Sequence, residues 1–199
     1  MPRRDDLNTI LVLGSGPIKI GQAAEFDFSG SQAVRALRED GYEVILVNSN
    51  PATIQNDPEM ADRVYIEPLL PDTVRKILEI EKPDALLAGM GGQTALNIAS
   101  ELSHDGTLER LGVELIGSDL DAIDKAEDRE LFNQVCESID LPISQAIACN
   151  SMEEVIKAAE EIGSWPILIR PAFTLGGLGG GTAFDMGQLV EIATLGLRN

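Results

Sequence analysis

The sequence has 199 residues, a length that suits one or two domains with a substantial hydrophobic core. Its 44% hydrophobic and 24% charged residues are typical of a soluble globular protein, with neither a membrane-spanning apolar run nor a signal-type stretch after "MPRRDD". The formal net charge of −18 argues against nucleic acid or an anionic membrane as a general partner. Cys136 and Cys149 give neither a disulfide framework nor metal-ligand spacing, so we expect a cytoplasmic protein with reduced thiols.

Apolar runs alternate with helical patterns over the first 118 residues. The runs expected to form strands are "TILVL" (9–13), "EVILVN" (43–48), "DALLAG" (84–89) and "VELIG" (113–117). The patterns expected to form helices are "SGSQAVRALREDG" (29–41), "DTVRKILEIE" (72–81) and "GQTALNIASEL" (92–102). Because each strand is apolar throughout, we expect an α/β domain over residues 1–118, with a parallel sheet covered by helices on both faces.

The regular alternation of apolar runs and helical patterns ends after this domain. The elements expected next are a polar helical stretch (118–140), a strand "ISQAIAC" (143–149), a helix "SMEEVIKAAEEIG" (151–163), strands in "WPILIRP" (165–171) and "GTAF" (181–184), and a closing helix "GQLVEIATLG" (187–196). Ser151 and Glu154 form a capping box at the start of the helix expected at residues 151–163. We therefore expect a second, α+β unit over residues 119–199 that ends before it is complete.

The loop "GGLGGG" (Gly176–Gly181) carries five glycines in six positions. Such a loop lets backbone N–H groups turn toward an anion, because no side chains stand in the way. It follows an apolar strand that ends at Arg170. An arginine at the end of a buried strand and beside a glycine loop favours a binding function over a purely structural one.

The turn "GSGPIKIG" after the first strand has the glycines of a dinucleotide-binding fingerprint, but it departs from that motif in two places. Lys19 stands where the third glycine is expected, and Asn48 stands where an acidic residue would hold a ribose hydroxyl. A dehydrogenase is therefore disfavoured. The turn serves either a ligand or the close packing of a helix.

Two further loops invite a functional interpretation. The segment "NSNPATIQNDPEMADRVYIEP" (48–68) is either a long surface connection or a functional or interface loop, and its length favours the second. "GMGGQTALN" follows the third expected strand and so lies at the carboxyl edge of the sheet, where open α/β sheets bind ligands. Gly91, Gly92 and Gln93 could receive either a ligand or a neighbouring domain.

These stretches together resemble the N-terminal part of the carbamoyl-phosphate synthetase large-chain family. The stretches that carry the resemblance are, in the family's order, "GSGPIKIGQAAEFDFSGSQA", "VNSNPATIQNDPEMADRVYIEP", "GMGGQTALN", "IDKAEDRELF" and "ILIRPAFTLGGLGGG". They cover almost the entire chain from Asn8 and are most similar to the first of the family's two homologous halves. The resemblance implies a Rossmann-like pre-ATP-grasp domain that binds no dinucleotide, followed by an incomplete α+β lobe of an ATP-grasp domain.

The resemblance also implies site residues. Arg129 and Arg170 would contact the phosphates of ATP, with Gly176 and Gly177 in a glycine-rich hairpin that closes over the nucleotide. Many ATP-grasp enzymes have lysine in place of Arg170, and an arginine suits bidentate phosphate contact. Without the resemblance, Arg129 is better interpreted as a solvated helix charge paired with Asp128 or Glu130. We expect no catalytic base and no metal ligand in this chain.

The implied reaction is ATP-dependent phosphorylation of bicarbonate to carboxyphosphate, from which ammonia forms carbamate, in arginine and pyrimidine biosynthesis. The cofactors would be ATP and Mg²⁺ or Mn²⁺, with the metal ligands outside this chain. The partners would be the remainder of the large subunit and a glutamine amidotransferase small subunit, and the chain alone would be inactive. The alternatives are a non-catalytic nucleotide-binding or assembly module, and part of another ATP-grasp ligase such as a biotin-dependent carboxylase.

Overall fold

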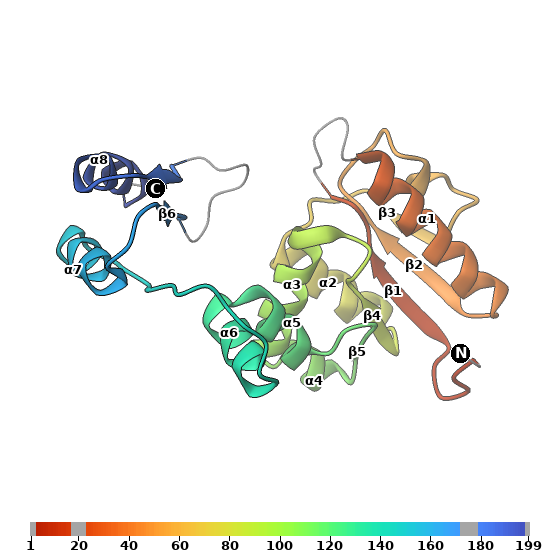
Figure 1. Cartoon of the computed structure of the whole chain (residues 1–199). Coiled ribbons are helices and arrows are strands. Elements are labelled where there is room, and N and C mark those ends of the chain that lie inside the picture. The colour runs from red at the N-terminus through yellow and green to blue at the C-terminus, as the bar shows by residue number, and fades with distance from the viewer. Residues whose placement is uncertain (1–2, 17–22, 172–178, 198–199) are drawn as a thin grey trace. The chain divides into compact units, whose positions relative to one another are not determined.

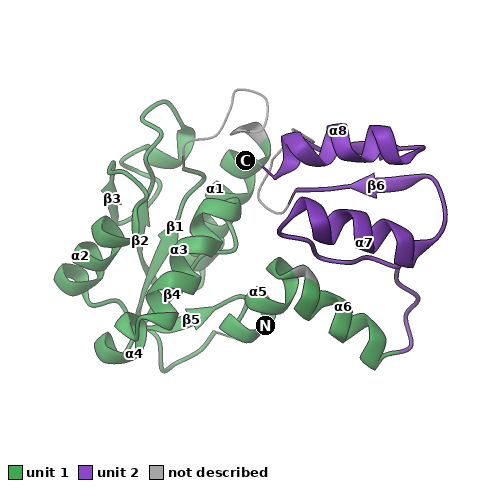
Figure 2. Cartoon of the chain, turned by 90° about the vertical axis from the view of Figure 1, so that its left-hand side faces the viewer, with its two compact units in different colours: residues 1–139 green, residues 140–199 purple. Residues whose placement is uncertain are grey.

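The computed structural model describes residues 3–16, 23–171 and 179–197. It divides into two compact units, residues 1–139 and 140–199 (Figures 1 and 2). Helices α5 (Leu120–Glu127) and α6 (Arg129–Ser138), assigned from sequence to the second domain, belong to the first compact unit. The sequence-based domain boundary at residue 118 stays a prediction, since compactness alone does not define a domain.

A five-stranded parallel sheet forms the centre of the first unit, with the order β3-β2-β1-β4-β5. The strands are β1 Thr9–Leu13, β2 Glu43–Val47, β3 Arg63–Tyr65, β4 Ala85–Leu87 and β5 Glu114–Ile116. The helices packed around it include α1 Ala23–Glu39, α2 Pro71–Glu81, α3 Gly92–His104 and α4 Thr107–Leu111. The strand order reverses between β1 and β4, so the crevice expected of an open α/β sheet lies at their carboxyl ends.

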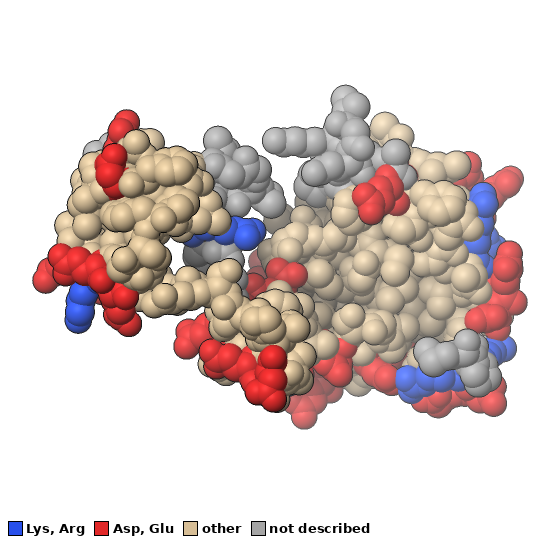
Figure 3. Space-filling view, viewed as in Figure 1, with Lys and Arg blue, Asp and Glu red and all other residues tan. Residues whose placement is uncertain are grey.

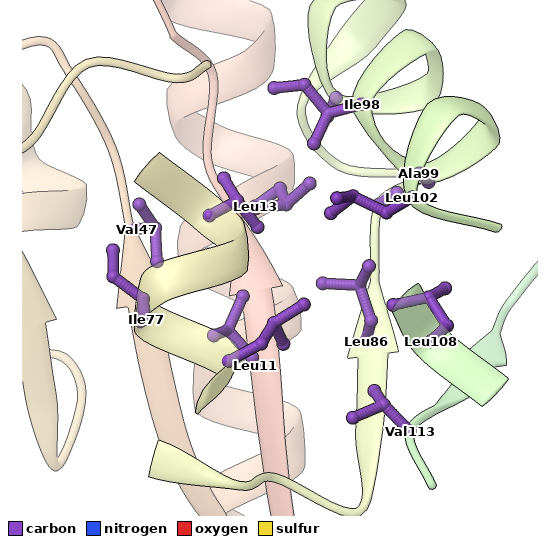
Figure 4. Packing of buried hydrophobic residues seen from close by; sticks show 14 of the residues in the cluster. Leu11, Leu13, Val47, Ile77, Leu86, Ile98, Ala99, Leu102, Leu108 and Val113 are labelled. Atoms are coloured by element: carbon purple, nitrogen blue, oxygen red, sulfur yellow. The ribbon is translucent and has the colours of Figure 1, made fainter. Parts of the chain in front are cut away.

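Each face of this sheet has its own hydrophobic core. Ile10 of β1 lies in a buried cluster with Val34 of α1. The next residue, Leu11, points to the opposite face and belongs to a second buried cluster that includes Ile77 of α2 and Ile98 of α3 (Figure 4). Burial of each such side chain contributes about 1.5–3 kcal/mol to folding. The expectation of a parallel sheet covered on both faces is confirmed.

The segment expected to be one long polar loop contains two short elements, the 3₁₀ helix η1 (Ile54–Asn56) and the strand β3. The loop prediction was therefore wrong over Arg63–Tyr65. This strand lies at the edge of the sheet and carries one aliphatic residue, Val64, so it lacks the apolar run that marks the other strands. Arg63 instead forms ion pairs with Glu43 and Glu81.

In its described part, the second unit contains two helices and a β-hairpin. Its elements are α7 Met152–Ile162, β6 Ile167–Ile169, β7 Gly181–Ala183 and α8 Met186–Gly196. The two strands pair antiparallel, and Ile167 and Leu189 are among the residues of a small buried core. Ser151 caps α7 as predicted by accepting from Glu154 N at 3.2 Å, while the Glu154 carboxylate accepts from Asn150 N at 2.6 Å.

The strand expected at residues 143–149 is absent from the structure, which describes this whole segment. Its larger apolar side chains, Ile143 and Ile147, are both 37% exposed, so neither is buried in a hydrophobic core. No neighbouring described segment pairs with it. The prediction was wrong because an apolar run forms a strand only where a partner strand supplies hydrogen bonds.

Acidic side chains are spread over the face seen in Figure 3 and outnumber the basic ones there, as the composition indicates. No helix within the described ranges is both long enough and apolar enough to cross a membrane. Cys136 and Cys149 are free thiols, and burial is the main cause that raises the pKa of Cys149.

Candidate functional site

The end of β6 and the start of β7 approach each other closely, and we call this part of the second unit the hairpin base. Ile169 pairs with Gly181 across the hairpin. A Cβ atom on Gly180 would lie 2.9 Å from the Ile169 carbonyl oxygen and 3.8 Å from the Arg170 Cα, so the two backbones approach closely here. Only glycine fits at position 180 without a shift of the backbone.

Arg170 follows β6 directly and thus stands beside this close approach. Its side chain is exposed, and within the described part of the chain it forms no ion pair or hydrogen bond. In a chain with 33 acidic residues, an arginine without a carboxylate partner keeps its guanidinium donors available for another anion. An arginine beside a backbone path that only glycine can follow suits the binding of a phosphate group.

Two of the predicted nucleotide-binding positions, Gly176 and Gly177, lie outside the described residues. Arg129 is the first residue of α6, and its side chain is not among those described. Asp128 caps this helix by accepting from Glu130 N at 2.8 Å and from Leu131 N at 3.0 Å. The structure therefore describes the backbone of Arg129 in the first compact unit and the side chain of Arg170 in the second.

Helix α5 is tied to α3 by three polar side-chain contacts. Gln93, at the start of α3, donates to the Glu127 carboxylate at 2.6 Å. Further along, Asp124 accepts from Ser100 at 3.2 Å and lies 3.2 Å from His104 Nε2. The Gln93–Glu127 contact connects the motif "GMGGQTALN" with the motif "IDKAEDRELF", which lie about 25 residues apart in the sequence.

His104 and Ser100 do not form a nucleophilic site, although they contact an aspartate. The Ser100 hydroxyl donates to Asp124, while His104 Nδ1 lies 3.2 Å from the Ser100 oxygen. The histidine therefore bridges α3 and α5 on an exposed surface. Among the residues described, no group of three or more His, Cys, Asp or Glu side chains is placed to hold a metal ion.

A buried polar network lies at the carboxyl edge of the sheet. Asn48 is fully buried, and its Oδ1 accepts from Gly16 N at 3.0 Å. Its Nδ2 lies 3.4 Å from Ser15 Oγ and 3.5 Å from Gln55 Oε1. Ser15 and Gln55 in turn both donate to Asp27 Oδ1, at 3.2 and 3.3 Å. The network therefore holds the loop after β1, the helix α1 and the helix η1 in one arrangement.

The sequence indicated Asn48 only as a departure from a dinucleotide motif, and it missed Gln55 and Asp27. The available signal for Gln55 was a polar residue in a loop rich in Asn-Pro and Asp-Pro turns. At the switch point, a Cβ on Gly91 would lie 2.4 Å from the Gly14 carbonyl oxygen, so backbone contacts backbone. This close backbone approach leaves no room for a side chain at position 91.

Two family models match the chain. The model described as "Carbamoyl phosphate synthase preATP-grasp domain" matches residues 6–125, and the model described as "Carbamoyl-phosphate synthase L chain, ATP binding domain" matches residues 128–199. The chain belongs to the carbamoyl phosphate synthase large-chain family. The resemblance drawn from the sequence motifs is confirmed.

Curated relatives agree with this assignment. The carbamoyl phosphate synthase large chains of Synechocystis sp. and Archaeoglobus fulgidus are 58% and 59% identical to the chain and cover 99% and 100% of it. The "Carbamoyl phosphate synthase large chain, N-terminal section" of Aquifex aeolicus is 58% identical and covers 96%. The chain spans 18% of the length of the first two relatives and 34% of the third.

Solved structures share the fold at low sequence identity. One is the biotin carboxylase domain of the Hydrogenobacter thermophilus 2-oxoglutarate carboxylase in complex with MgADP, ADP and bicarbonate, with a TM-score of 0.67 and 20% identity over 94% of this chain and 40% of that chain. Another is an ADP complex of N5-carboxyaminoimidazole ribonucleotide synthetase, with a TM-score of 0.67 and 16% identity over 98% and 47%. The predicted fold class is confirmed, namely a Rossmann-like pre-ATP-grasp domain followed by an α+β ATP-grasp lobe.

Proposed function

We propose that the chain acts as the N-terminal section of a carbamoyl phosphate synthase large chain. In this role it contributes to the ATP-dependent phosphorylation of bicarbonate to carboxyphosphate, from which ammonia forms carbamate. The proposal is supported by the identity of 58–59% to large chains from distant organisms and by the Aquifex relative, itself an N-terminal section. A place in arginine and pyrimidine biosynthesis and in the cytoplasm is part of the same proposal.

The observation that carries the nucleotide-binding part is the position of Arg170 at the base of the hairpin. Residues 128–199 match the ATP binding domain of the family, and within them Arg170 is exposed, unpaired in the described chain and next to the close backbone path at Gly180. Its guanidinium would bind phosphate oxygens of ATP in bidentate fashion and neutralise charge that develops during phosphoryl transfer. Arg129, Gly176 and Gly177 would complete the phosphate contacts.

ATP would be bound together with Mg²⁺ or Mn²⁺, which neutralises phosphate charge during transfer. The described part of this chain offers no cluster of metal ligands, so we place those ligands in the remainder of the large subunit. A glutamine amidotransferase small subunit would supply the ammonia. The chain would then be inactive by itself and active in the assembled enzyme.

The test is bicarbonate-dependent ATP hydrolysis by the chain alone and mixed with the rest of the large chain. The latter can be supplied by the Archaeoglobus relative without the section that this chain matches. We expect activity only in the mixture, and Arg170→Ala to lower it on the order of 100-fold, as for a lost transition-state charge contact. Arg35→Ala, at another exposed arginine without an ion pair in the described chain, is the matched control. A bound but inactive mixture would point to an assembly module.

A further inference from the structure

A hollow with a volume of about 310 Å³ lies at the carboxyl ends of β2 and β3. It is lined by Ser49, Ile66, Glu67, Pro68, Leu69 and Leu70. We call it the carboxyl-edge hollow. It lies away from the β6–β7 hairpin in sequence and belongs entirely to the first compact unit.

The walls of the carboxyl-edge hollow are apolar side chains left in solvent. Ile66 is 53% exposed and Leu70 is 56% exposed, while Leu69 is buried and belongs to the main hydrophobic core. Through Leu69 the lining of the hollow is therefore continuous with the core, and the exposed Ile66 and Leu70 add aliphatic surface. Two large aliphatic side chains exposed on either side of a hollow are typical of a surface that another polypeptide covers.

Ser49 adds a polar requirement to this surface. Its hydroxyl oxygen is buried and has no hydrogen-bond partner among the described residues. A buried polar atom without a partner is unfavourable, and in most folded proteins it is paired. The group that covers the hollow is thus expected to bring a hydrogen-bonding group to Ser49 along with apolar side chains.

The net charge of the chain helps to decide between possible occupants. Two copies of a chain with a formal charge of −18 repel each other, so a second copy is disfavoured. Among the described residues that line the hollow, Glu67 alone is ionisable, and its negative charge disfavours an acidic ligand. In the relatives, the matched section makes up 18% of the polypeptide, and the remaining sequence of the same large chain is the partner at hand.

We propose that the carboxyl-edge hollow is a docking site for the rest of the large chain, which inserts an aliphatic or aromatic side chain over Leu69 and hydrogen-bonds to Ser49. This inference rests on the proposed function, because it takes the partner from it. It adds the surface through which the chain recognises that partner. It also assigns a role to the end of the conspicuous 48–68 loop, which the nucleotide site does not use.

Leu70 offers a substitution that separates docking from folding. It occupies the N-cap of α2 with extended backbone angles and makes no side-chain cap. Aspartate is among the preferred residues at this position, so Leu70→Asp is expected to leave the fold intact or stabilise it. The same change removes an apolar wall of the hollow and places a charge there. We expect it to weaken binding of the rest of the large chain on the order of 10- to 100-fold.

The matched control is Ile80→Asp. Ile80 lies on the same helix, is 70% exposed and does not line the hollow, and its substitution adds the same charge. A second variant, Ser49→Ala, removes the unpaired hydroxyl. It is expected to leave the free chain as stable as before or more stable, yet to weaken binding by a few-fold. A purely structural role for Ser49 would not give this combination.

The experiment measures the affinity of the full 199-residue chain for the Archaeoglobus large chain that lacks the matched section, by calorimetry, with melting curves for every variant. Weaker binding by Leu70→Asp with unchanged binding by Ile80→Asp supports the proposal. Equal binding by Leu70→Asp and wild type overturns it and leaves the proposed function standing. Absence of binding by the wild type overturns both. Self-association that Leu70→Asp abolishes would assign the hollow to a second copy and also overturn the proposal.

Discussion

Gln93 Nε2 donates a hydrogen bond to the Glu127 carboxylate at 2.6 Å and joins the start of α3 to the end of α5. Asp128 is both the C-cap residue of α5 and the N-cap residue of α6, and Arg129 is the first residue of α6. The carboxyl edge of the sheet is thus linked through one side-chain contact to the residue that begins the proposed nucleotide-binding segment. We expect the position of the Arg129 backbone to depend on this link.

Loss of the Gln93–Glu127 contact is expected to loosen α5 and the start of α6. In Glu127→Ala the contact is absent, whereas Glu127→Gln keeps an acceptor oxygen for Gln93. A hydrogen bond of this kind contributes roughly 1 kcal/mol, so amides of residues 124–131 should exchange about five times faster in Glu127→Ala and near the wild-type rate in Glu127→Gln. Hydrogen exchange read by mass spectrometry measures this. Glu137→Ala, an exposed change on α6, is the control, and equal exchange in both variants would contradict the role of the contact.

The fold could be predicted from sequence where the pattern of apolar residues is strong. The four strands "TILVL", "EVILV", "ALL" and "ELI" were recognised because the buried sheet requires apolar side chains on both faces. β3 was missed because an edge strand of three residues needs no such run, and Arg63 contributes ion pairs instead. The strand expected at 143–149 failed for the opposite reason, since a suitable local run finds no partner strand among the residues that the structure describes.

The candidate site was predictable only in part. Arg170 and the glycines were marked by composition and by the family resemblance, and both are local in sequence. The links that organise the first unit are not local, because Gln55 and Asp27 meet only once the helix η1 packs on α1. Asn48 illustrates the difference. The sequence indicated only that Asn48 does not fit a dinucleotide-binding motif, whereas the structure shows which groups it hydrogen-bonds.

Asn48 should not tolerate a negative charge, although Asp is the residue that a dinucleotide site would place there. In Asn48→Asp the buried carboxylate keeps the Gly16 N–H donor but faces Gln55 Oε1 and loses its own amide donor. We expect the free energy of unfolding to fall by about 2–4 kcal/mol, as for a buried and incompletely paired charge. Urea denaturation measures this. Gln134→Glu makes the same chemical change at an exposed site, and a similar loss there would remove the argument.

The ion pairs of the N-terminal segment are expected to make the free energy of unfolding depend on pH in the acid range. The Arg4 guanidinium donates to Glu114 at 2.6 and 2.8 Å and to Asp6 at 3.1 Å, and these hydrogen bonds lower the pKa of both carboxyls. Because the folded pKa lies below the unfolded one, the stabilisation is present above the unfolded values of about 4.3 and 3.9 and is lost as the pH falls through the folded values.

Urea midpoints of wild type and Arg4→Met should therefore differ by a constant amount between neutral pH and about pH 5 and converge below about pH 4. All three side chains are exposed, so the difference should be small and should shrink further in high salt. A gap that widens as the pH falls would contradict the assignment of the acid-sensitive contacts to Arg4.

The hairpin base gives a prediction that connects stability with nucleotide binding. A Cβ on Gly180 would lie 2.9 Å from the Ile169 carbonyl oxygen, so Gly180→Ala must push the two strands apart next to Arg170. We expect a loss of about 1–3 kcal/mol, as for an overpacked site, seen as faster amide exchange in residues 179–197. ATP binding by the mixture with the rest of the large chain should weaken at the same time. At Gly89 a Cβ meets no atom within 4 Å, so Gly89→Ala is the matched control and should change neither property. If Gly180→Ala neither accelerated amide exchange in residues 179–197 nor weakened ATP binding, the close approach at the hairpin base could not be what positions Arg170.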